Sequence, residues 1–457
     1  MSTSTPAASV NGDQAFREGF ISVLLGLSIV LVIMNTMMFN LALPSVAREY
    51  HLSASSSSWI VTGYSIVFAI ASITYSRLSD FIPIRRLFVI ALLSLSLAAI
   101  AGLFSDSFIT LLIARLVQAS GAGAIPALSL VLIARYVPLE RRGKAMALIM
   151  SSASLGLGLG PVAGGAIVEF LGWHDLFAVT AVTLLLVPLF AALLPAEKPA
   201  KGTFDALGAL FIGVGTTGLL LFLTTRSGIA LAAGVIALAL FVVRIRAARD
   251  PFVQPRLFRN RPYLMLIAVG IAAYLCSFAS LFLMPQILVN LYGLSAIASG
   301  LVIFPGSLLA LFMSRKVGKI IDAFGNAGII RFVPLLVLSS VLLFALFAGT
   351  SYLAILLIYM LLSIGFTCLS SSVSNEISRI LPTSQIGSGM GLFQLLQFFS
   401  GAFGVATTAS ALTWQKDLPL KAAYSNIYWG LAIIVLVSIV CAYLYGRRSR
   451  CPVQSEA

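Results

Sequence analysis

The sequence predicts an all-α polytopic membrane protein, and two observations carry this prediction. Of the 457 residues, 60% are apolar and only 10% are charged, so the chain has too few charges to cover the surface of a water-soluble protein. The apolar residues also gather into blocks of about 17–25 residues, the length that an α-helix needs to cross the hydrocarbon core of a bilayer. We therefore expect membrane-spanning helices joined by short polar loops.

Fourteen apolar blocks follow one another along the chain. The first is too long for the core of a signal peptide and lacks a small-residue cleavage pattern, so we expect it to be retained. The seventh and eighth blocks are short. The predicted spans are 20–43, 58–77, 87–105, 108–131, 145–168, 175–194, 206–224, 228–243, 262–285, 297–315, 329–349, 352–373, 388–411 and 427–446.

The distribution of Lys and Arg predicts that both termini lie in the cytoplasm. With this orientation the inner segments hold 24 of the 29 Lys and Arg residues, and the outer segments hold only Arg48, Arg226, Lys416 and Lys421. Positively charged short loops stay on the cytoplasmic side of a membrane protein. The net charge of +14 is then a topological signal, and no nucleic-acid partner is expected.

Cofactor and enzyme chemistry find no support in the sequence. The four cysteines, Cys276, Cys368, Cys441 and Cys451, are scattered, and no Cys/His spacing suggests a metal site or a disulfide framework. The chain has no Walker A sequence for ATP and no catalytic triad. We expect no cofactor, no metal and no enzymatic activity.

Two loops repeat one pattern eight spans apart. "SRLSDFIPIRR" at 76–86 follows the second span, and "GKIIDAFGNAGIIR" at 318–331 follows the tenth. Each places an aspartate, Asp80 or Asp322, four residues after a small residue, and cations follow. Parallel repeats of this kind are typical of transporters whose substrate site lies between two related halves.

This repeat predicts two six-helix bundles with an inserted helix pair. The expected parts are a disordered cytoplasmic N-terminus at 1–19, a bundle at 20–196, a linker with the extra pair at 197–254, a bundle at 255–446, and a cytoplasmic tail at 447–457. Asp80 with Arg85 and Arg86, and Asp322 in the second copy, are candidates for a conformational latch that pairs in one state and opens in another. The alternative is a static charge cluster that fixes topology.

Further motifs resemble the fourteen-helix drug:proton antiporters of the major facilitator superfamily. "RLVQASGAG" at 115–123 resembles the motif of their fourth helix, and "GLGLGPVAGG" at 156–165 resembles the antiporter motif of their fifth. "IPALSLVLIARYVPLERRGKAMALI" and "DPFVQPRLF" are similar to segments of Gram-positive tetracycline efflux proteins. The resemblance implies a major facilitator fold and proton-driven export. Where the tetracycline pumps carry an acidic residue in the first and thirteenth helices, this chain has neutral residues.

Arg115 is the charge that most needs an explanation. It lies about 10 Å deep in the fourth span at 1.5 Å per residue, where a charge costs at least about 2.5–3.5 kcal/mol. No acidic residue lies on the same span, and Gln118 follows one turn later. We expect Arg115 to face a cavity, where it lowers the pKa of a titrating group or attracts an anionic substrate. We favour the first role, because a broad-specificity pump cannot depend on one anion contact; a purely structural arginine is the alternative.

Other polar and small residues suggest a cavity and a close helix contact. Gln394 and Gln397 share a helical face, and they can either line a cavity or bond between helices. The candidate cavity residues are Arg115, Gln118, Asn35, Asn40, Tyr64, Gln394 and Gln397. The fifth span should bend or pack tightly through Gly156, Gly158, Gly160, Pro161, Gly164 and Gly165.

The sequence thus predicts a bacterial inner-membrane exporter of amphiphilic small molecules, driven by protons, with the lipid bilayer, protons and a small molecule as its partners. A tetracycline-specific pump, an exporter of an anionic metabolite or siderophore, and a non-transporting membrane sensor stay open as alternatives. The outer-end residues Glu169, His174 and Asp175 are candidates for a proton acceptor.

Overall fold

The computed structural model describes residues 18–52, 54–197, 199, 205–248, 251–382, 385–415 and 417–448, and the elements of regular structure in these ranges are helices. Up to the linker they are α1 (Glu18–Glu49), α2 (Ala54–Leu78), α3 (Ile84–Leu103), α4 (Phe108–Tyr136), α5 (Leu139–Phe170), α6 (Asp175–Ala181), the 3-10 helix η1 (Val182–Leu185) and α7 (Leu186–Leu193). After it come α8 (Ala206–Thr225), α9 (Gly228–Ala247), α10 (Pro255–Arg259), α11 (Arg261–Tyr292), α12 (Ala296–Phe324), α13 (Ala327–Phe347), α14 (Tyr352–Ile380), α15 (Ile386–Trp414) and α16 (Leu420–Arg448).

Most of these helices are built to cross a membrane. Within the described ranges, twelve helical segments are long and apolar enough to do so. The count becomes thirteen when Ile297–Met313 and Lys316–Phe324, which meet at an angle of 42°, are taken as one bent span. Ala206–Leu219 is a shorter apolar helix. The expectation of fourteen spans stays a prediction.

The starts of several helices are fixed by polar side chains. The first backbone N–H groups of a helix have no partner within the helix, so a side-chain oxygen just before it stabilises the start. The side chains that accept such a bond at the starts of α4, α9, α11, α12 and α14 are Ser107, Ser227, Asn260, Ser295 and Ser351. The polar residues between the apolar blocks therefore determine where these helices begin.

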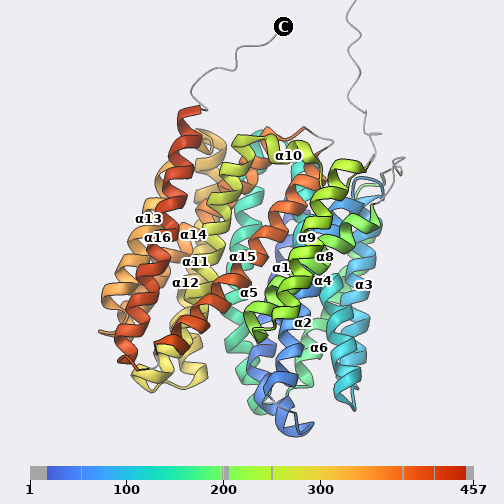
Figure 1. Ribbon diagram of the computed structural model, residues 1–457. Helices are drawn as coiled ribbons and strands as arrows, with labels where there is room; N and C mark the ends of the chain where they lie inside the picture. The colour runs from blue at the N-terminus through green and yellow to red at the C-terminus, as the bar shows by residue number, and fades with distance from the viewer. Residues whose placement is uncertain are drawn as a thin grey trace, which may run out of the picture.

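Two groups of helices pack side by side (Figure 1). In the N-terminal half α1 packs on α5, and α4 packs on α2 and α3; in the C-terminal half α11 packs on α15, and α13 packs on α14 and α16. The two halves meet chiefly where α5 contacts α12 and α14 and where α2 contacts α15. Residues at these contacts therefore join the two halves.

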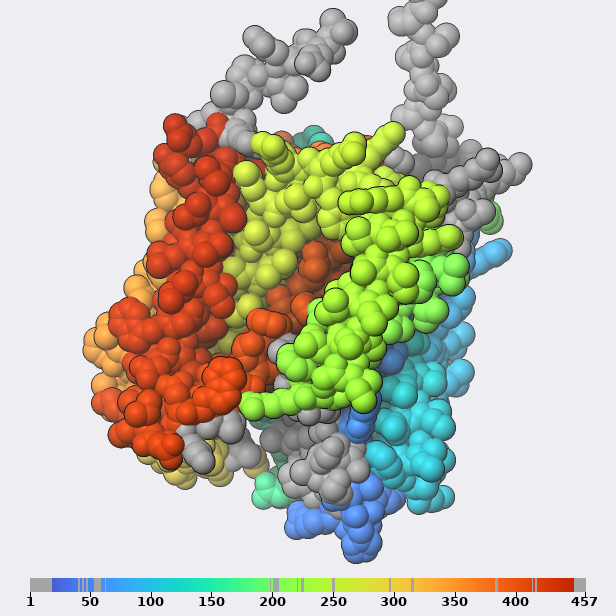
Figure 2. Space-filling model, in the orientation of Figure 1, coloured from blue at the N-terminus to red at the C-terminus, as the bar shows by residue number. Residues whose placement is uncertain are grey.

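The α8–α9 pair forms a hairpin of its own. Its two helices approach closely, because a Cβ added at Gly218 would lie only 2.6 Å from the Cα of Gly234. Outside the hairpin, α8 contacts both α2 and α15. Figure 2 shows this green hairpin standing between the cyan α3 and the red α15 and α16. It thus lies against the junction of the two halves and touches one helix of each.

Candidate functional site

Arg115 is fully buried in the N-terminal half, together with three of the predicted cavity residues. Its Nη1 donates to Oε1 of Gln118 at 2.5 Å and to Oδ1 of Asn35 at 3.4 Å. Nδ2 of Asn35 in turn donates to the hydroxyl of Tyr64 at 3.2 Å. Three helices, α1, α2 and α4, therefore bring these four side chains into one cluster.

Two aromatic rings hold the guanidinium of Arg115. Its Cζ lies 3.8 Å from the ring centroid of Phe39 and 4.0 Å from that of Tyr64. A cation over an aromatic face gains about 0.5–2 kcal/mol, with the larger values where water is excluded. The sequence did not single out Phe39, because an aromatic residue in an apolar span carries no local signal of its role.

The cluster contains a charge without a counter-ion. No ion pair to Arg115 is found in the part of the chain that the structure describes, and its Nε and Nη2 have no hydrogen-bond partner there. Tyr64 is a weak acid, and Glu169, His174 and Asp175 lie far along the chain, at the end of α5 and the start of α6. The geometry therefore supports a role of Arg115 in binding a ligand better than a role in lowering the pKa of a neighbouring titrating group.

A row of aromatic rings connects this cluster to the C-terminal half. The ring of Tyr64 lies 6.2 Å from that of Phe68, which contacts Phe398 of α15 at 4.5 Å. Beyond Phe398 lie Tyr274 at 6.0 Å and Phe278 at 6.4 Å, both on α11. The row therefore crosses the boundary between the halves.

Gln394 and Gln397 lie on α15 beside Phe398 and are almost fully buried, at 1% and 0% exposure. Oε1 of Gln394 and both polar atoms of the Gln397 amide lack a hydrogen-bond partner within the described residues. No hydrogen bond joins either glutamine to Arg115 there. The side chain of Asn40, the remaining predicted cavity residue, lies outside the described part of the structure.

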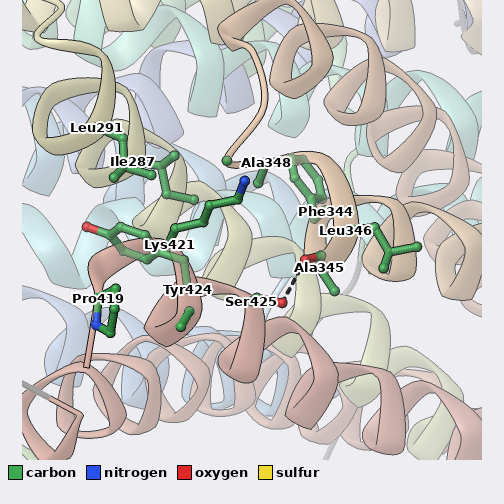
Figure 3. A pocket seen from close by; sticks show the side chains of 12 residues that line it. Ile287, Leu291, Phe344, Ala345, Leu346, Ala348, Pro419, Lys421, Tyr424 and Ser425 are labelled. Atoms are coloured by element: carbon green, nitrogen blue, oxygen red, sulfur yellow. Dashed lines mark hydrogen bonds between the residues drawn. The ribbon is translucent and has the colours of Figure 1, made fainter. Parts of the chain in front are cut away.

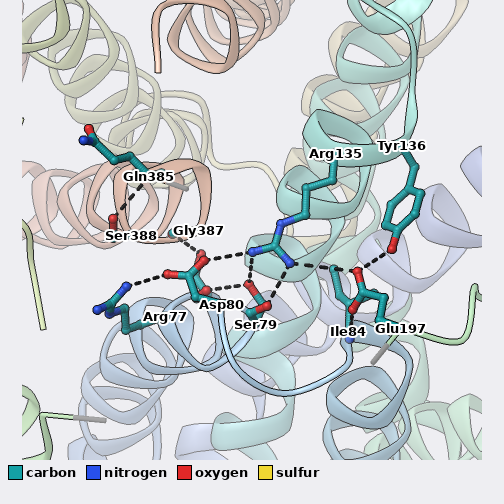
Figure 4. Close-up of polar contacts among 11 residues, drawn as sticks. Arg77, Ser79, Asp80, Ile84, Arg135, Tyr136, Glu197, Gln385, Gly387 and Ser388 are labelled. Carbon is teal, nitrogen blue, oxygen red and sulfur yellow. Dashed lines mark hydrogen bonds and ion pairs between the residues drawn. The ribbon is translucent and has the colours of Figure 1, made fainter. Parts of the chain in front are cut away.

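In the loop after α2, Asp80 is held by two arginines (Figure 4). Arg77 Nη1 lies 2.7 Å from Oδ2 of Asp80, and Arg135 Nη2 lies 2.8 Å from Oδ1. These partners replace Arg85 and Arg86, which the sequence suggested. The reason is helical geometry: Arg77 lies one turn before Asp80, whereas Arg85 and Arg86 begin the next helix, α3.

Asp80 also touches the other half. Its Oδ1 lies so close to Gly387, at the start of α15, that a Cβ there would be only 2.1 Å away. One turn earlier, the Ser76 hydroxyl donates to the Gly387 carbonyl at 2.7 Å. Burial raises the pKa of the Asp80 carboxyl, although Arg135 and Arg77 act in the opposite direction.

Asp322 occupies the corresponding place in the second half. Its two carboxylate oxygens accept from the backbone N–H groups of Gly143 at 2.9 Å and Lys144 at 3.3 Å, in the first turns of α5. An anion is stabilised at a helix N-terminus. Both aspartates of the repeated loop therefore contact the first turns of a helix in the opposite half.

Sequence reasoning missed one repeated pattern, which runs from the end of the preceding helix (α4 or α14) into the start of each receiving helix (α5 or α15). An arginine is followed by a proline after three residues, a glycine after eight and a methionine after eleven. The two copies are Arg135, Pro138, Gly143 and Met146, and Arg379, Pro382, Gly387 and Met390. Comparing the segments after the fourth and twelfth predicted spans would have revealed Arg135, Gly143 and Gly387.

The glycines of α5 allow close packing on both sides. A Cβ at Gly156, Gly160 or Gly164 would lie within 3.0 Å of α1, and one at Gly158 would lie 2.3 Å from Ser307 Oγ of α12. Pro161 is inside the helix, and Gly165 is partly buried. These contacts agree with tight packing.

Glu197 extends the Asp80 cluster to the start of the linker. Its carboxylate accepts from the Ile84 backbone N–H at 2.7 Å and from the Tyr136 hydroxyl, and it lies 4.0 Å from Arg135 (Figure 4). Arg77 reaches the other end of the linker, where Nη2 donates to the Pro251 carbonyl at 3.4 Å. The Asp80 cluster is thus connected to both ends of the segment that carries α8 and α9.

A separate cavity of about 450 Å³ lies between α11, α13 and the start of α16 (Figure 3). Ile287, Leu291, Phe344 and Tyr424 line it, and Lys421 reaches across it. It shares no lining residue with the Arg115 cluster, so it does not belong to the candidate site.

Comparison with known proteins agrees with this architecture. The model of the Major Facilitator Superfamily matches residues 25–405. The riboflavin transporter RibZ of Clostridioides difficile is 24% identical over 95% of this chain and 98% of its own length. The lincomycin resistance protein LmrB of Bacillus subtilis is 27% identical over 82% of this chain and 81% of its own length. The crystal structure of the human organic anion transporter MFSD10 covers 93% of this chain and 99% of its own, with a TM-score of 0.69; at 18% identity this likeness shows the fold alone.

Proposed function

The chain belongs to the Major Facilitator Superfamily, and from this premise we propose that it exports amphiphilic small molecules across the bacterial inner membrane, driven by the proton gradient. Proteins of this family are multi-pass membrane transporters of small molecules and are not enzymes. The proposal concerns the direction, the driving force and the substrate.

One observation carries the proposal. The buried polar cluster of the N-terminal half is joined by the row of aromatic rings to the C-terminal half, and Asp80 and Asp322 hold the two halves together at one end. A transporter that works by alternating access needs a site between its halves and an end that can close and reopen. Release of the two aspartates from the starts of α15 and α5 is the movement that would open this site to the cytoplasm.

The direction of transport is inferred from relatives and from α5. LmrB is named as a lincomycin resistance protein, which favours export of a foreign compound. The glycine-rich segment of α5 resembles the antiporter motif, and it packs closely on α1 and α12. Asp80, with its raised pKa, is the proposed proton-responsive group at the inner end.

The proposed topology has fourteen spans with both termini in the cytoplasm. The bundles at 20–196 and 255–446 would each contribute six spans, and the α8–α9 hairpin in the linker at 197–254 would lie outside them. The contacts of α8 with both α2 and α15 support a peripheral position at the junction of the bundles.

Export of an anionic or neutral metabolite is the second candidate. Arg115 has no acidic partner among the described residues, so the site carries a net positive charge. RibZ, which is named as a riboflavin transporter, aligns over almost the whole chain. A tetracycline-specific pump has less support, because neutral residues stand in the first and thirteenth predicted spans. Membership of a transporter family argues against a non-transporting sensor.

A susceptibility panel in a pump-deficient bacterial host tests the proposal. Expression of the chain should raise resistance to at least one amphiphilic compound, and a protonophore should abolish the difference in efflux. The Asp80→Asn variant, expressed at the same level, serves as the inactive control. Export that persists after the proton gradient collapses would contradict proton coupling, and unchanged resistance to every compound would contradict drug efflux.

A further inference from the structure

The buried site combines flat aromatic faces with amide groups that have no partner. The rings come from α2, α11, α14 and α15, and they are Tyr64, Phe68, Tyr274, Phe278, Phe366 and Phe398. Tyr274 and Phe278 are stacked at 5.7 Å with an interplanar angle of 20°, whereas Phe68 meets Phe398 edge-on at 4.5 Å. Rings arranged in this way favour planar, conjugated ligands, which stack on ring faces and meet ring edges.

The amides of Gln394 and Gln397 come from α15, the helix that carries Phe398. Gln394 lies four residues before Phe398 and three before Gln397, so it shares a helical face with each of them. A buried polar group without a partner costs about 1–3 kcal/mol, so buried amides are normally satisfied by protein, water or ligand. Gln397 offers both a free donor and a free acceptor. A primary amide with both groups free is complementary to a lactam or imide edge, which presents C=O and N–H side by side.

The charge of Arg115 limits which ligands the site can bind. Arg115 contributes a positive charge and two free donor atoms, Nε and Nη2. No acidic side chain pairs with it in the described ranges, and none of the acidic residues of the sequence lies in the middle of a predicted span. A planar cation would meet repulsion from Arg115 without a carboxylate to offset it. A neutral or anionic ligand would meet only donors, amides and rings.

We infer that the site binds planar heteroaromatic compounds that are neutral or anionic and that carry a lactam or imide edge, with Gln397 and Gln394 reading that edge. The inference rests on the proposed transport function, because it gives the substrate class of the same site. It excludes planar cationic dyes as preferred substrates, although such dyes are amphiphilic.

Equilibrium binding to the purified full-length protein in lipid nanodiscs tests the inference without any gradient. Three probes are compared by fluorescence: lumiflavin, which is planar and neutral with an imide edge, its N3-methyl derivative, which lacks the imide N–H, and the planar cation ethidium. Lumiflavin should bind about tenfold tighter than the N3-methyl derivative, because a site built for a hydrogen bond rejects an analogue that lacks it. Ethidium should bind more weakly than either.

Three glutamine variants test which side chain distinguishes lumiflavin from its N3-methyl derivative. Gln397→Leu should remove the discrimination between lumiflavin and its N3-methyl derivative, and Gln394→Leu should reduce it. Gln415→Leu makes the same change just beyond the outer end of α15, where the amide bonds Ala411 and Asn426, and it should keep the discrimination. The probe comparison on the wild-type protein needs no variant, so it decides even if a substitution prevents folding.

Equal binding of lumiflavin and its methyl derivative, preferred binding of ethidium, or no binding of any probe overturns the inference. Discrimination that survives in Gln397→Leu overturns the assignment to that amide. Failure of the proposed function would look different. If everted vesicles never concentrate any probe while lumiflavin binding keeps its preference, export is contradicted and the ligand class is supported.

Discussion

Arg115 shows how a single residue can be tolerated at membrane depth without a counter-ion. Its insertion costs at least about 2.5–3.5 kcal/mol. The cation–π contacts with the rings of Phe39 and Tyr64 stabilise the charge by up to about 2 kcal/mol each, which is of the same order as the cost. Gln118 and Asn35 also accept hydrogen bonds from Nη1 of Arg115. Since these terms nearly cancel, stability alone gives little reason for a charge here, and a role in ligand binding is the better explanation.

At the residue scale, Arg115→Met should separate stability from transport. Methionine fills the space between two rings with favourable sulfur–aromatic contacts, so the melting temperature in detergent should stay within a few degrees of the wild type. Export of an acidic probe per molecule of transporter should fall by about tenfold or more, because a charge-assisted contact is lost. Arg447→Met, which removes an exposed arginine near the ring of Tyr443, is the matched control. Wild-type export by Arg115→Met would show that Arg115 has no part in transport.

At the element scale, the start of α15 and the end of α2 form one half of the proposed latch at the inner end. Burial raises the pKa of Asp80, so the closed inner end binds a proton more tightly than a state in which Asp80 is in water. Lowering the pH through this raised pKa therefore favours the closed end, and raising the pH favours its release. Under the proposed topology, this linkage would make cytoplasmic pH a control on reopening.

This sign leads to a prediction for Asp80→Asn, whose side chain stays neutral like the protonated acid. Substrate exchange across vesicles, measured with equal pH on both sides, should rise with pH in the wild type. In the Asp80→Asn variant, substrate exchange should be about tenfold slower, which is within the usual range of conformational coupling. Exchange by this variant should also be independent of pH. Asp106→Asn, an exposed change in another loop, should behave like the wild type. A pH profile that survives in Asp80→Asn would assign the titration to another group.

The α1–α5 pair is a second element whose fit can be tested. A Cβ at Gly160 would lie 2.4 Å from the Cβ of Met37, whereas one at Gly430 on α16 would meet nothing within 4 Å. Gly160→Val should therefore destabilise the protein by about 1–3 kcal/mol, the usual cost of overpacking, and lower its melting temperature. Gly430→Val should leave the melting temperature unchanged. Equal stability of the two variants would mean that α1 can move away from α5 without cost.

At the scale of the whole molecule, the hairpin of α8 and α9 is tied to both halves. Buried Asp205 caps α8 through the Gly208 N–H at 3.1 Å, pairs with Arg244 of α9 at 3.0 Å, and accepts from Phe252 N–H at 3.3 Å. These bonds close the hairpin at its inner end. The linker thus holds α8 and α9 in place while its own ends reach the Asp80 latch.

The proposed topology predicts the sides on which two positions lie. Residue 226 follows α8, and residue 331 lies near the start of α13, so fourteen spans with cytoplasmic termini place them on opposite faces. Single cysteines at 226 and 331, introduced after replacement of the four native cysteines, should be labelled from opposite sides by an impermeant reagent. Labelling of both positions from one side would contradict the topology.

The sequence by itself determined the class of the protein, because hydropathy and span length are local properties that need no partner. It also singled out Asp80 and Asp322 through their repeated loops, and Arg115 through the cost of burying a charge; the roles of these residues stay predictions. It gave the wrong partners for Asp80, since Arg135 comes from α4, far along the chain. Only the tertiary structure decided that Phe39 and Tyr64 hold Arg115 and that Gly387 and Gly143 contact the carboxylates of Asp80 and Asp322. It also decided which glutamine amides have no hydrogen-bond partner among the described residues. These are contacts between helices distant in sequence, and their geometry depends on how the two halves pack.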